Sequence, residues 1–377
     1  MASEDRYAKP VDSIDWAVGG TFDTNFRWEY QDGRDSLLKL YEKGKERQWN
    51  ANTRIDWSQD LDPENPEQLP DESIPLFGSD VFAALTPSEK ANLRRHFQSW
   101  QLSQFLHGEQ GALICTAKIV QQVPRIDAKF YAATQVIDEA RHVEAYSRLL
   151  HDKFELAYPI TPTLQRLLDN VLSDSRWDMT YLGMQVLIEG LALAAFAQIR
   201  DQSQNPLAAA VNAYVMQDEA RHVAFGRFAL RDYYPTLTQA ERDEREEFAV
   251  EACYLMRDRF QAEEVWATLG LPVDRCAAHM LESGFMQNYR SALFSRIVPI
   301  IKDIGLWGPK IRKGYEQMGI LGYANVDVQA MSDEDEKVAE HYDERHAEIL
   351  RVAASATEPA SAGRTVTNGK GGSRASA

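Results

Sequence analysis

The stretch QVIDEARHVEAY (residues 135–146) contains the hexamer DEARHV, which returns in VMQDEARHVAFG (residues 215–226), 80 positions later. Within each copy a glutamate precedes a histidine by three positions, as Glu139 with His142 and Glu219 with His222. Residues three apart on an α-helix lie on one face about one turn apart, so both side chains can reach the same point. A single Glu-x-x-His pair arises easily by chance, whereas two copies on helices of matched length indicate a shared site.

Two apolar segments each carry a glutamate thirty residues before these motifs. Glu109 lies in FLHGEQGALICTA (residues 105–117), and Glu189 lies in QVLIEGLALAA (residues 185–195). The chain should turn near Pro124 and again within residues 202–206, so each glutamate lies about as far before its turn as its motif lies after it. At about 1.5 Å rise per residue, the equal legs of an antiparallel hairpin bring these groups to one height. All six residues repeat at an offset of 80, which predicts a duplicated helical hairpin.

Each half supplies one glutamate from its first helix and one Glu-x-x-His pair from its second, which is the ligand set of di-iron and di-manganese carboxylate bundles. Four buried carboxylates would repel one another, and two divalent cations would neutralise them. Carboxylate oxygens and imidazoles suit iron or manganese better than structural zinc. We therefore predict two iron ions, with a mixed manganese–iron pair left open. The predicted ligands are Glu109, Glu139, His142, Glu189, Glu219 and His222.

Helical periodicity and capping signals cover most of the chain, and no stretch shows the sustained alternation of a half-buried strand. We expect an all-α protein in which residues 1–85 form an arm packed on a bundle of residues 86–235. Additional helices of the same domain would follow over residues 236–331, and an acidic segment with a disordered tail over residues 332–377. The predicted helices cover residues 36–49, 86–122, 127–153, 163–172, 177–200, 205–234, 238–269 and 272–299.

The composition limits the classes of protein to which the chain can belong. A formal net charge of −16 over 377 residues argues against nucleic-acid binding, because a polyanion would be repelled. Cys115, Cys253 and Cys276 are too few and too scattered for a disulfide framework or a thiolate metal site. The start lacks the apolar run of a signal peptide, and the most apolar run, residues 186–199, is too short to span a bilayer. We expect a cytoplasmic protein that does not bind a membrane.

With these residues assembled, the chain resembles the ferritin-like di-iron superfamily, in particular its oxygen-activating members. The repeated Asp-Glu-x-Arg-His pattern is similar to the signature of bacterial multicomponent monooxygenase hydroxylases and to forms in ribonucleotide reductase small subunits. The resemblance implies a ferritin-like four-helix bundle with additional helices, and dioxygen as co-substrate. It also implies that the aspartates accept hydrogen bonds from the ligand histidines and that the arginines brace the aspartates. The residues concerned are Asp138, Arg141, Asp218 and Arg221.

Three positions bear on which branch of the superfamily the chain resembles most. Tyr146 lies one turn after His142, where ribonucleotide reductase small subunits often hold a radical tyrosine, but the C-terminal residues 354–377 contain no tyrosine to relay a radical. The monooxygenases usually carry a threonine where Leu193 stands. Arylamine N-oxygenases often carry a seventh ligand, a histidine, where Val215 stands.

The leading hypothesis is an oxygenase or oxidase that uses dioxygen to hydroxylate, N-oxygenate or desaturate a small organic substrate. A reductase or ferredoxin would supply electrons, and we expect a homodimer. The alternative is a radical-generating or ligand-binding oxidase that uses Tyr146, although a packing role for this tyrosine is the plainer interpretation. Iron oxidation and storage is a third hypothesis, and the large N-terminal arm argues against it.

Overall fold

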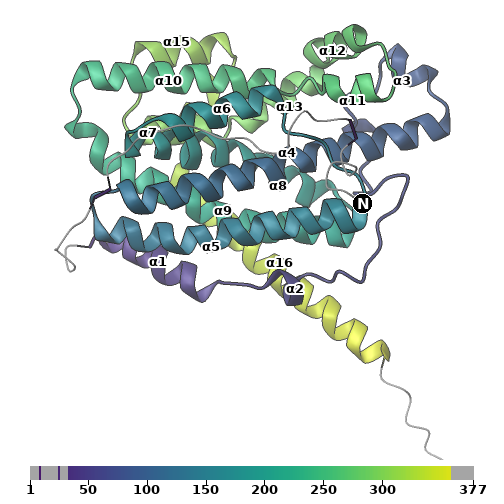
Figure 1. Cartoon of the computed structure of the whole chain (residues 1–377), viewed down its shortest axis with the longest axis horizontal. Helices are drawn as coiled ribbons and strands as arrows, with labels where there is room; N and C mark the ends of the chain where they lie inside the picture. The colour runs from purple at the N-terminus through teal and green to yellow at the C-terminus, as the bar shows by residue number, and fades with distance from the viewer. Residues whose placement is uncertain (1–7, 10–23, 26–32, 358–377) are drawn as a thin grey trace, which may run out of the picture.

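The computed structural model describes residues 8–9, 24–25 and 33–357, and it is built from helices (Figure 1). Apart from an isolated bridge at Ala157, no strand occurs in these residues, which confirms the all-α prediction. Four helices lie side by side and form the central bundle (Figure 1). They are α4 (Pro87–Gln122), α5 (Ile126–Arg148), α8 (Glu189–Gln202) and α9 (Pro206–Tyr233).

Two of the bundle helices, α4 and α9, begin at residues whose side chains cap them. The Thr86 hydroxyl accepts a hydrogen bond from the main-chain N–H of Glu89, and the Glu89 carboxylate accepts one from the main-chain N–H of Thr86. At the start of α9 the Asn205 side chain accepts hydrogen bonds from two main-chain N–H groups of the first turn, and Pro206 occupies the first helical position. Because caps satisfy donors that a helix leaves unpaired, they fix where α4 and α9 start, and these helices carry Glu109 and Glu219.

The third bundle helix runs continuously through α7 (Trp177–Tyr181), η4 (Leu182–Ile188) and α8. Segment η4 has π-helical hydrogen bonding, which the sequence analysis does not anticipate. Such widened turns are rare in α-helices and frequent at functional sites. By length and composition the helix Trp177–Gln202 could cross a membrane, which corrects the argument that its apolar run is too short, but 83% of its most apolar window is buried inside the protein.

Further helices cover the bundle on two sides (Figure 1). Below it in Figure 1, α1 (Asp35–Glu46) packs on α5 and α9, and α16 (Val328–Thr357) packs on α9. Glu336 of α16 forms ion pairs with Lys43 and Arg47, which joins α16 to the α1 region. On the opposite side the covering helices are α6 (Pro162–Ser173), α10 (Gln239–Asp258) and α15 (Pro309–Gln317).

Two predicted helices after the bundle are too long. The helix predicted over 238–269 ends at Asp258, and α11 begins only after Ala262, whose φ of 49° is left-handed and interrupts the helix. The helix predicted over 272–299 is divided into three. Ser283 accepts a hydrogen bond from the Met286 main-chain N–H and so starts a new helix, a capping signal that the apolar periodicity obscured.

The remaining helical segments connect and close the molecule. Segment η3 (Leu149–Phe154) is a π-helical turn at the end of α5. The others are shorter α-helices and 3₁₀ turns. They are α2 (Ala51–Arg54), η2 (Asp71–Ser73), α3 (Asp80–Ala84), η5 (Tyr234–Thr236), α11 (Glu263–Thr268), α12 (Val273–Glu282), α13 (Gly284–Leu293), α14 (Ile297–Asp303) and η6 (Leu321–Asn325).

The end of the chain is helical further than predicted. The predicted disordered tail begins at Ala354, but α16 continues to Thr357, so the first four residues of that segment belong to a helix. Residues 358–377 of the predicted tail lie outside the described residues. The division into arm, bundle, additional helices and tail stays a prediction.

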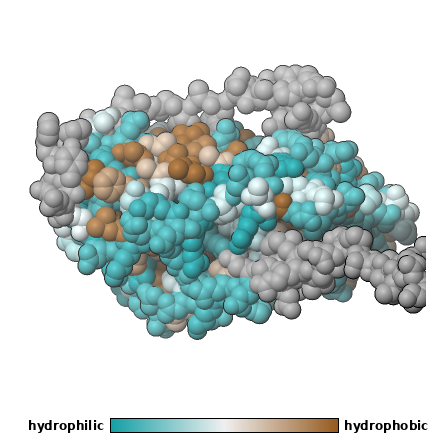
Figure 2. All heavy atoms as spheres, turned by 90° about the horizontal axis from the view of Figure 1, so that it is seen from below, coloured by the Kyte–Doolittle hydropathy of each residue, from teal (hydrophilic) through white to brown (hydrophobic). Residues whose placement is uncertain are grey.

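The molecular surface is mostly hydrophilic on the face shown in Figure 2, with one area where hydrophobic residues gather. Exposed large apolar side chains on the bundle helices include Ile137 at 57% and Phe130 at 37% exposure on α5, and Ile114 at 50% on α4. Scattered exposed apolar residues are normal on a protein surface. The expected homodimer therefore stays a prediction.

Candidate metal centre

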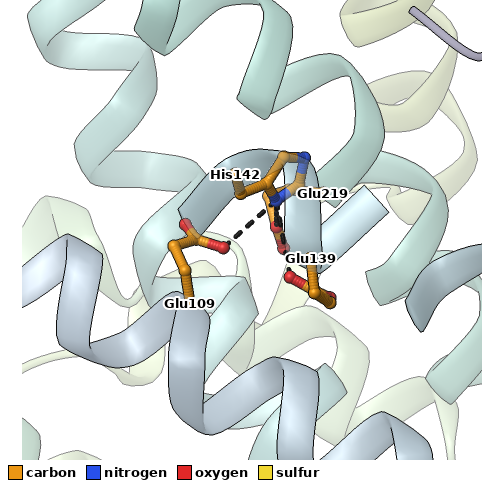
Figure 3. A group of neighbouring side chains, drawn as sticks. All are labelled: Glu109, Glu139, His142 and Glu219. Carbon is orange, nitrogen blue, oxygen red and sulfur yellow. Dashed lines mark hydrogen bonds and ion pairs between the residues drawn. The ribbon is translucent and has the colours of Figure 1, made fainter. Parts of the chain in front are cut away.

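The structure brings all six predicted ligands together in the middle of the bundle, and each is at most 5% exposed. Their ligand atoms form two groups, and within each group all of these atoms lie within 4.8 Å of one another. One group contains Glu109, Glu139, His142 and Glu219 (Figure 3). The other contains Glu139, Glu189 and His222. Glu139 belongs to both, so the two groups are joined by one carboxylate.

The distances around the histidines show how Glu139 can serve two positions. Its Oε2 lies 3.4 Å from Nδ1 of His142, and its Oε1 lies 3.1 Å from Nδ1 of His222. Oε1 of Glu219 also lies near both rings, at 3.1 Å from Nδ1 of His142 and 3.5 Å from Nδ1 of His222. Glu109 approaches only His142 among the two histidines, with Oε2 at 3.1 Å from Nδ1. Both histidines therefore turn Nδ1 toward the carboxylates.

Several atoms of this cluster lack the partners that buried polar atoms normally have. Among the described residues, no hydrogen-bond partner exists for Oε2 of Glu139, Oε2 of Glu189, either carboxylate oxygen of Glu219 or Nδ1 of His222. A buried polar atom left unpaired is costly, so convergent unpaired carboxylate oxygens and an imidazole nitrogen fit a pair of divalent cations. The cluster is thus a carboxylate–histidine site suited to two metal ions.

The pKa values within the cluster agree with a site built for positive charge. Burial, followed by the negative charge of Glu219, raises the pKa of Glu109 from 4.5 to about 8. Burial, again followed by Glu219, raises the pKa of Glu189 well above its ordinary value. Burial alone would lower the pKa of His142, but Glu109 and the other carboxylates around the ring raise it well above its usual range. Divalent cations displace the protons that such groups hold, because metal ligands must be deprotonated.

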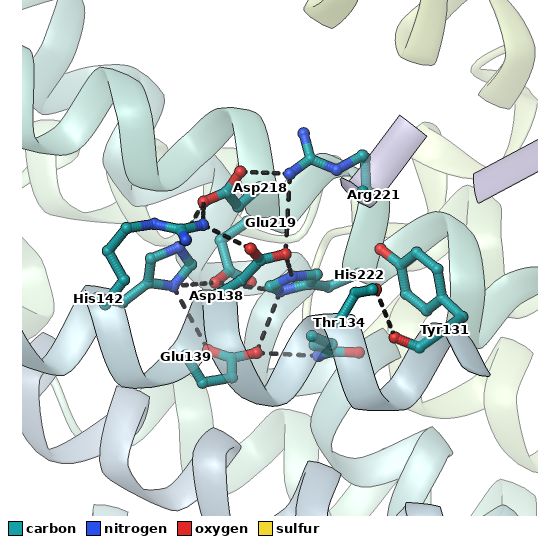
Figure 4. Close-up of polar contacts among 12 residues, drawn as sticks. Tyr131, Thr134, Asp138, Glu139, His142, Asp218, Glu219, Arg221 and His222 are labelled. Carbon is teal, nitrogen blue, oxygen red and sulfur yellow. Dashed lines mark hydrogen bonds and ion pairs between the residues drawn. The ribbon is translucent and has the colours of Figure 1, made fainter. Parts of the chain in front are cut away.

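The outer nitrogens of the two histidines bind aspartates of the opposite DEARHV copy (Figure 4). Nε2 of His142 lies 3.0 Å from Oδ2 of Asp218, and Nε2 of His222 lies 3.2 Å from Oδ2 of Asp138. Each aspartate thus fixes the ring orientation of a histidine on the other half of the duplication. This crossed arrangement ties the two hairpins to each other as well as to the cluster.

Two arginines hold the aspartates in place. Arg141 donates hydrogen bonds to Asp138 and, at 2.8 Å, to Asp218, so it contacts both copies of the motif. Arg221 donates to Asp218 and lies 3.8 Å from Oδ2 of Asp138. All four side chains are buried. The structure therefore brings Asp138, Arg141, Asp218 and Arg221 around the histidines, as the resemblance implies.

Two residues beside this network are missed by the sequence analysis. Gln48, just after α1, donates to Oδ1 of Asp138 at 2.7 Å and accepts a hydrogen bond of 2.7 Å from Arg141. The Trp49 indole N–H donates to Oδ2 of Asp218 at 2.8 Å, and the Arg141 guanidinium lies 4.7 Å from the centre of its ring. The run LYEKGKERQW (residues 40–49) contains both, but no spacing rule connects it with the motifs.

Tyr146 is completely buried among aromatic rings on one side of the cluster. Its ring centroid lies 5.9 Å from that of Phe105 and 5.9 Å from that of Phe196, and its hydroxyl donates to Oδ1 of Asn212 at 3.0 Å. Burial raises the pKa of its hydroxyl well above the ordinary value. These contacts give Tyr146 a packing role, and its predicted catalytic role stays a prediction.

A cavity of about 320 Å³ lies along the same ends of α4 and α8 as this aromatic layer. Aromatic and apolar side chains line much of it, together with glutamine amides. Trp100 is one of the lining residues, and its indole N–H has no hydrogen-bond partner within the part of the chain that the structure describes. The lining includes Phe97, Trp100, Gln101, Phe260, Met286 and Tyr289. Its size and composition suit a small aromatic molecule.

Solved structures similar to this chain include three variants of an R2-like ligand-binding oxidase with an anaerobically reconstituted Mn/Fe cofactor. Each is 19% identical to this chain at a TM-score of 0.44, and each match covers 75% of this chain. The matches cover 100%, 96% and 100% of the three structures. A search among curated proteins finds no match.

One family model matches most of the chain, over residues 29–305, and its description is p-aminobenzoate N-oxygenase AurF. The match includes all six clustered ligands and the four residues around the histidines. It holds although Val215 stands where N-oxygenases often carry a seventh ligand. The chain therefore belongs to the AurF family and is a dioxygen-dependent oxidoreductase of the di-iron carboxylate class.

Proposed function

We propose that this protein transfers one oxygen atom from dioxygen to the nitrogen of a small aromatic amine, at two iron ions held by the six-residue cluster. The observation that carries the proposal is the pair of carboxylate–histidine groups joined by Glu139, in a chain that matches the N-oxygenase family over residues 29–305. The first transfer would convert R–NH₂, O₂, two electrons and two protons into R–NHOH and water. An external reductase or ferredoxin would supply the electrons.

The side chains of the cluster would have different roles in metal binding. Glu109 and His142 would hold one ion and Glu189 and His222 the other, while Glu139 and Glu219 lie close enough to both histidines to span the pair. A bound iron pair supplies the reductive activation of dioxygen. The aspartates and arginines keep the imidazole rings oriented, and the surrounding apolar helices exclude bulk water.

The cavity beside the aromatic layer is our proposed substrate site. The stacked rings of Phe97 and Trp100, with centroids 5.7 Å apart, add aromatic surface to its lining, and the Gln101 side chain adds a polar group. Phe105 of α4 and Phe196 of α8 pack on each other, with ring centroids 4.7 Å apart. On each helix the phenylalanine lies between the residues that line the cavity and the ligand glutamate. A small flat molecule fits this setting better than a bulky one.

The test is a single-turnover reaction of iron-loaded, chemically reduced protein with ¹⁸O₂ and p-aminobenzoate or another arylamine. The proposal predicts a product that carries ¹⁸O on nitrogen, detected by mass spectrometry, and metal analysis of the same sample separates an iron pair from a manganese–iron pair. Oxygen uptake that no arylamine alters, together with a tyrosyl radical signal lost in Tyr146→Phe, would instead support the alternative oxidase.

A further inference from the structure

The offset of 80 residues that relates the ligands of the two halves also relates other positions around the metal centre. Phe105 precedes Glu109 and packs on Phe196, which follows Glu189, so α4 and α8 run in opposite directions past the cluster. Equivalent positions of the two halves therefore lie on opposite sides of the metal centre. Four such pairs flank the ligands, and they are Phe105 with Gln185, Val215 with Gln135, Tyr146 with Gly226, and Phe196 with Thr116.

In every pair the first residue is apolar or aromatic and the second is polar or glycine. The first set forms the aromatic side of the centre, where Phe105, Tyr146 and Phe196 pack ring against ring. We call the other set, with Tyr131 and Tyr181, the polar side. Gln135 joins it to the cluster, because its amide donates to Oε1 of Glu139 at 2.9 Å and to Oε1 of Glu189 at 3.1 Å.

The polar side contains buried hydrogen-bonding groups that have no partner among the described residues. Gln185 is 0% exposed, and neither atom of its amide has a hydrogen-bond partner in the residues that the structure describes. The same holds, over those residues, for Oε1 of Gln135, Oγ1 of Thr116 and the hydroxyls of Tyr131 and Tyr181. A buried polar group that stays unpaired destabilises the fold. Several together in one native core point to a polar occupant.

The backbone of α9 packs closely against Gln185. Gln185 lies in the π-helical segment η4, four residues before Glu189. Gly226 of α9 faces it so closely that a Cβ on this glycine would lie 2.6 Å from Cβ of Gln185. A glycine is therefore required where the opposite half carries Tyr146, because any side chain at this position would displace Gln185.

The polar side also extends outward to the surface. Tyr131 and Tyr181 both pack on Phe225, with ring centroids 4.3 and 5.0 Å from it. Tyr181 lines a cavity of about 310 Å³ together with Arg34 and Asp232. The Asp232 side chain is 49% exposed, so this cavity reaches solvent. Polar groups thus continue from Glu139 and Glu189 to the outside of the bundle.

We propose that the polar side is a water site, in which ordered water molecules bonded to Gln185, Gln135, Tyr131 and Tyr181 connect this cavity with the metal centre and deliver protons to it. Each proton enters from solvent and passes along the chain, with every water accepting one proton and donating another. The need for two protons per oxygen transfer rests on the proposed function. The aromatic side would then serve the substrate and the polar side the protons.

The kinetic test compares wild type with Gln185→Met, which keeps the side-chain length and removes both polar atoms. Reduced, iron-loaded protein is mixed with oxygen in H₂O and in D₂O, without any amine, and the optical change is followed. We expect a solvent isotope effect in wild type and a slowing of about tenfold or more in the variant, with iron content retained. Gln165→Met, the same substitution on α6 away from the cluster and both cavities, should keep the wild-type rate and isotope effect. Equal rates in wild type and Gln185→Met would overturn the proposal.

A structural test is independent of whether Gln185→Met folds and of the substrate. A high-resolution crystal structure of the iron-loaded wild type should show water oxygens within hydrogen-bond distance of both amide atoms of Gln185. An amide enclosed only by apolar atoms would contradict the water site. Because neither test contains an amine, a wrong substrate assignment would leave both results unchanged, and only the ¹⁸O₂ experiment would fail.

Discussion

The two DEARHV halves supply the same ligands but surround them with different neighbours. Around the first-half glutamate, Phe105 packs on Phe196, whereas the equivalent of Phe105 in the second half, Gln185, is a buried amide with no hydrogen-bond partner among the described residues. Metal ligation constrains both halves equally, because each must present one glutamate and one Glu-x-x-His pair. Positions one turn away carry no such constraint. Their divergence gives a symmetric cluster two chemically distinct sides.

The largest change in the free energy of unfolding is expected for the two arginines, one from each half of the duplication. Arg141 contacts Asp138, Asp218, Gln48 and the Trp49 ring. In the described structure Arg221 contacts the two aspartates and donates a hydrogen bond to the main-chain carbonyl of Gln217, so it does not reach the α1 region as Arg141 does. Removing a buried ion-pair partner costs about 3–5 kcal/mol. Arg141→Leu should therefore lower the free energy of unfolding in urea more than Arg221→Leu does. Equal losses would show that the first-half arginine has no special role.

The next prediction concerns the pH dependence of stability caused by Glu67, a fully buried carboxylate outside the cluster whose charge acts on Tyr146. Burial raises its pKa from 4.5 to about 8, and neither of its carboxylate oxygens has a hydrogen-bond partner in the described chain. Between these pH values the unfolded chain releases a proton that the folded protein keeps, so stability falls as pH rises from about 4.5 to 8. This loss amounts to a few kcal/mol, of order 1.4 per pKa unit.

Glu67→Gln should remove that pH dependence. Urea unfolding of wild type and variant at pH 5 and pH 8.5 measures it, and the variant should gain stability relative to wild type at the higher pH. Glu144→Gln, a change at an exposed position of α5, serves as the control and should follow wild type. If Glu67→Gln loses as much stability between the two pH values as wild type does, Glu67 is not protonated in the folded protein.

A smaller loss of stability is expected for a substitution at Gly226, the position equivalent to Tyr146 in the other half. Gly226→Ala places a Cβ 2.6 Å from Cβ of Gln185, so the side chain or the π-helical turn must shift. Overpacking of this kind costs about 1–3 kcal/mol. Thermal unfolding should show a lower melting temperature for Gly226→Ala, and Gly108→Ala, where a Cβ meets no described atom within 4 Å, is the control. Similar melting temperatures for both variants would mean that the space beside Gln185 is not restricted.

The smallest effect is expected for Tyr146→Phe. The variant loses the hydrogen bond to Asn212 and keeps the contacts with Phe105 and Phe196, so the free energy of unfolding should fall by about 1 kcal/mol. We expect arylamine oxygenation to persist, because the variant keeps the ring packing of Tyr146 on the aromatic side. Complete loss of oxygenation with an intact metal content would give Tyr146 the catalytic role instead.

Some features of this structure can be predicted from the sequence and others cannot, because only some of them depend on a regular spacing of residues. The ligands are predictable because Glu109 and Glu139 stand at fixed helical distances that recur in the second half. Gln48 and Trp49 are not, since their contacts with the aspartates depend on how an arm packs on the bundle. The π-helical segment Leu182–Ile188 is also hidden, because an apolar run buried on all sides has no polar face to reveal a changed period.

Because Glu139 belongs to both groups of ligand atoms, we expect two metal ions to depend on its carboxylate, and the iron content of three purified variants measures this. Wild type and the control Glu144→Ala should each bind two iron ions per chain after anaerobic reconstitution. Glu189→Ala removes a ligand of one group only and should leave about one. Glu139→Ala removes a ligand of both groups and should leave almost none. Retention of two iron ions by Glu139→Ala would contradict the shared carboxylate and, with it, the assignment of the cluster.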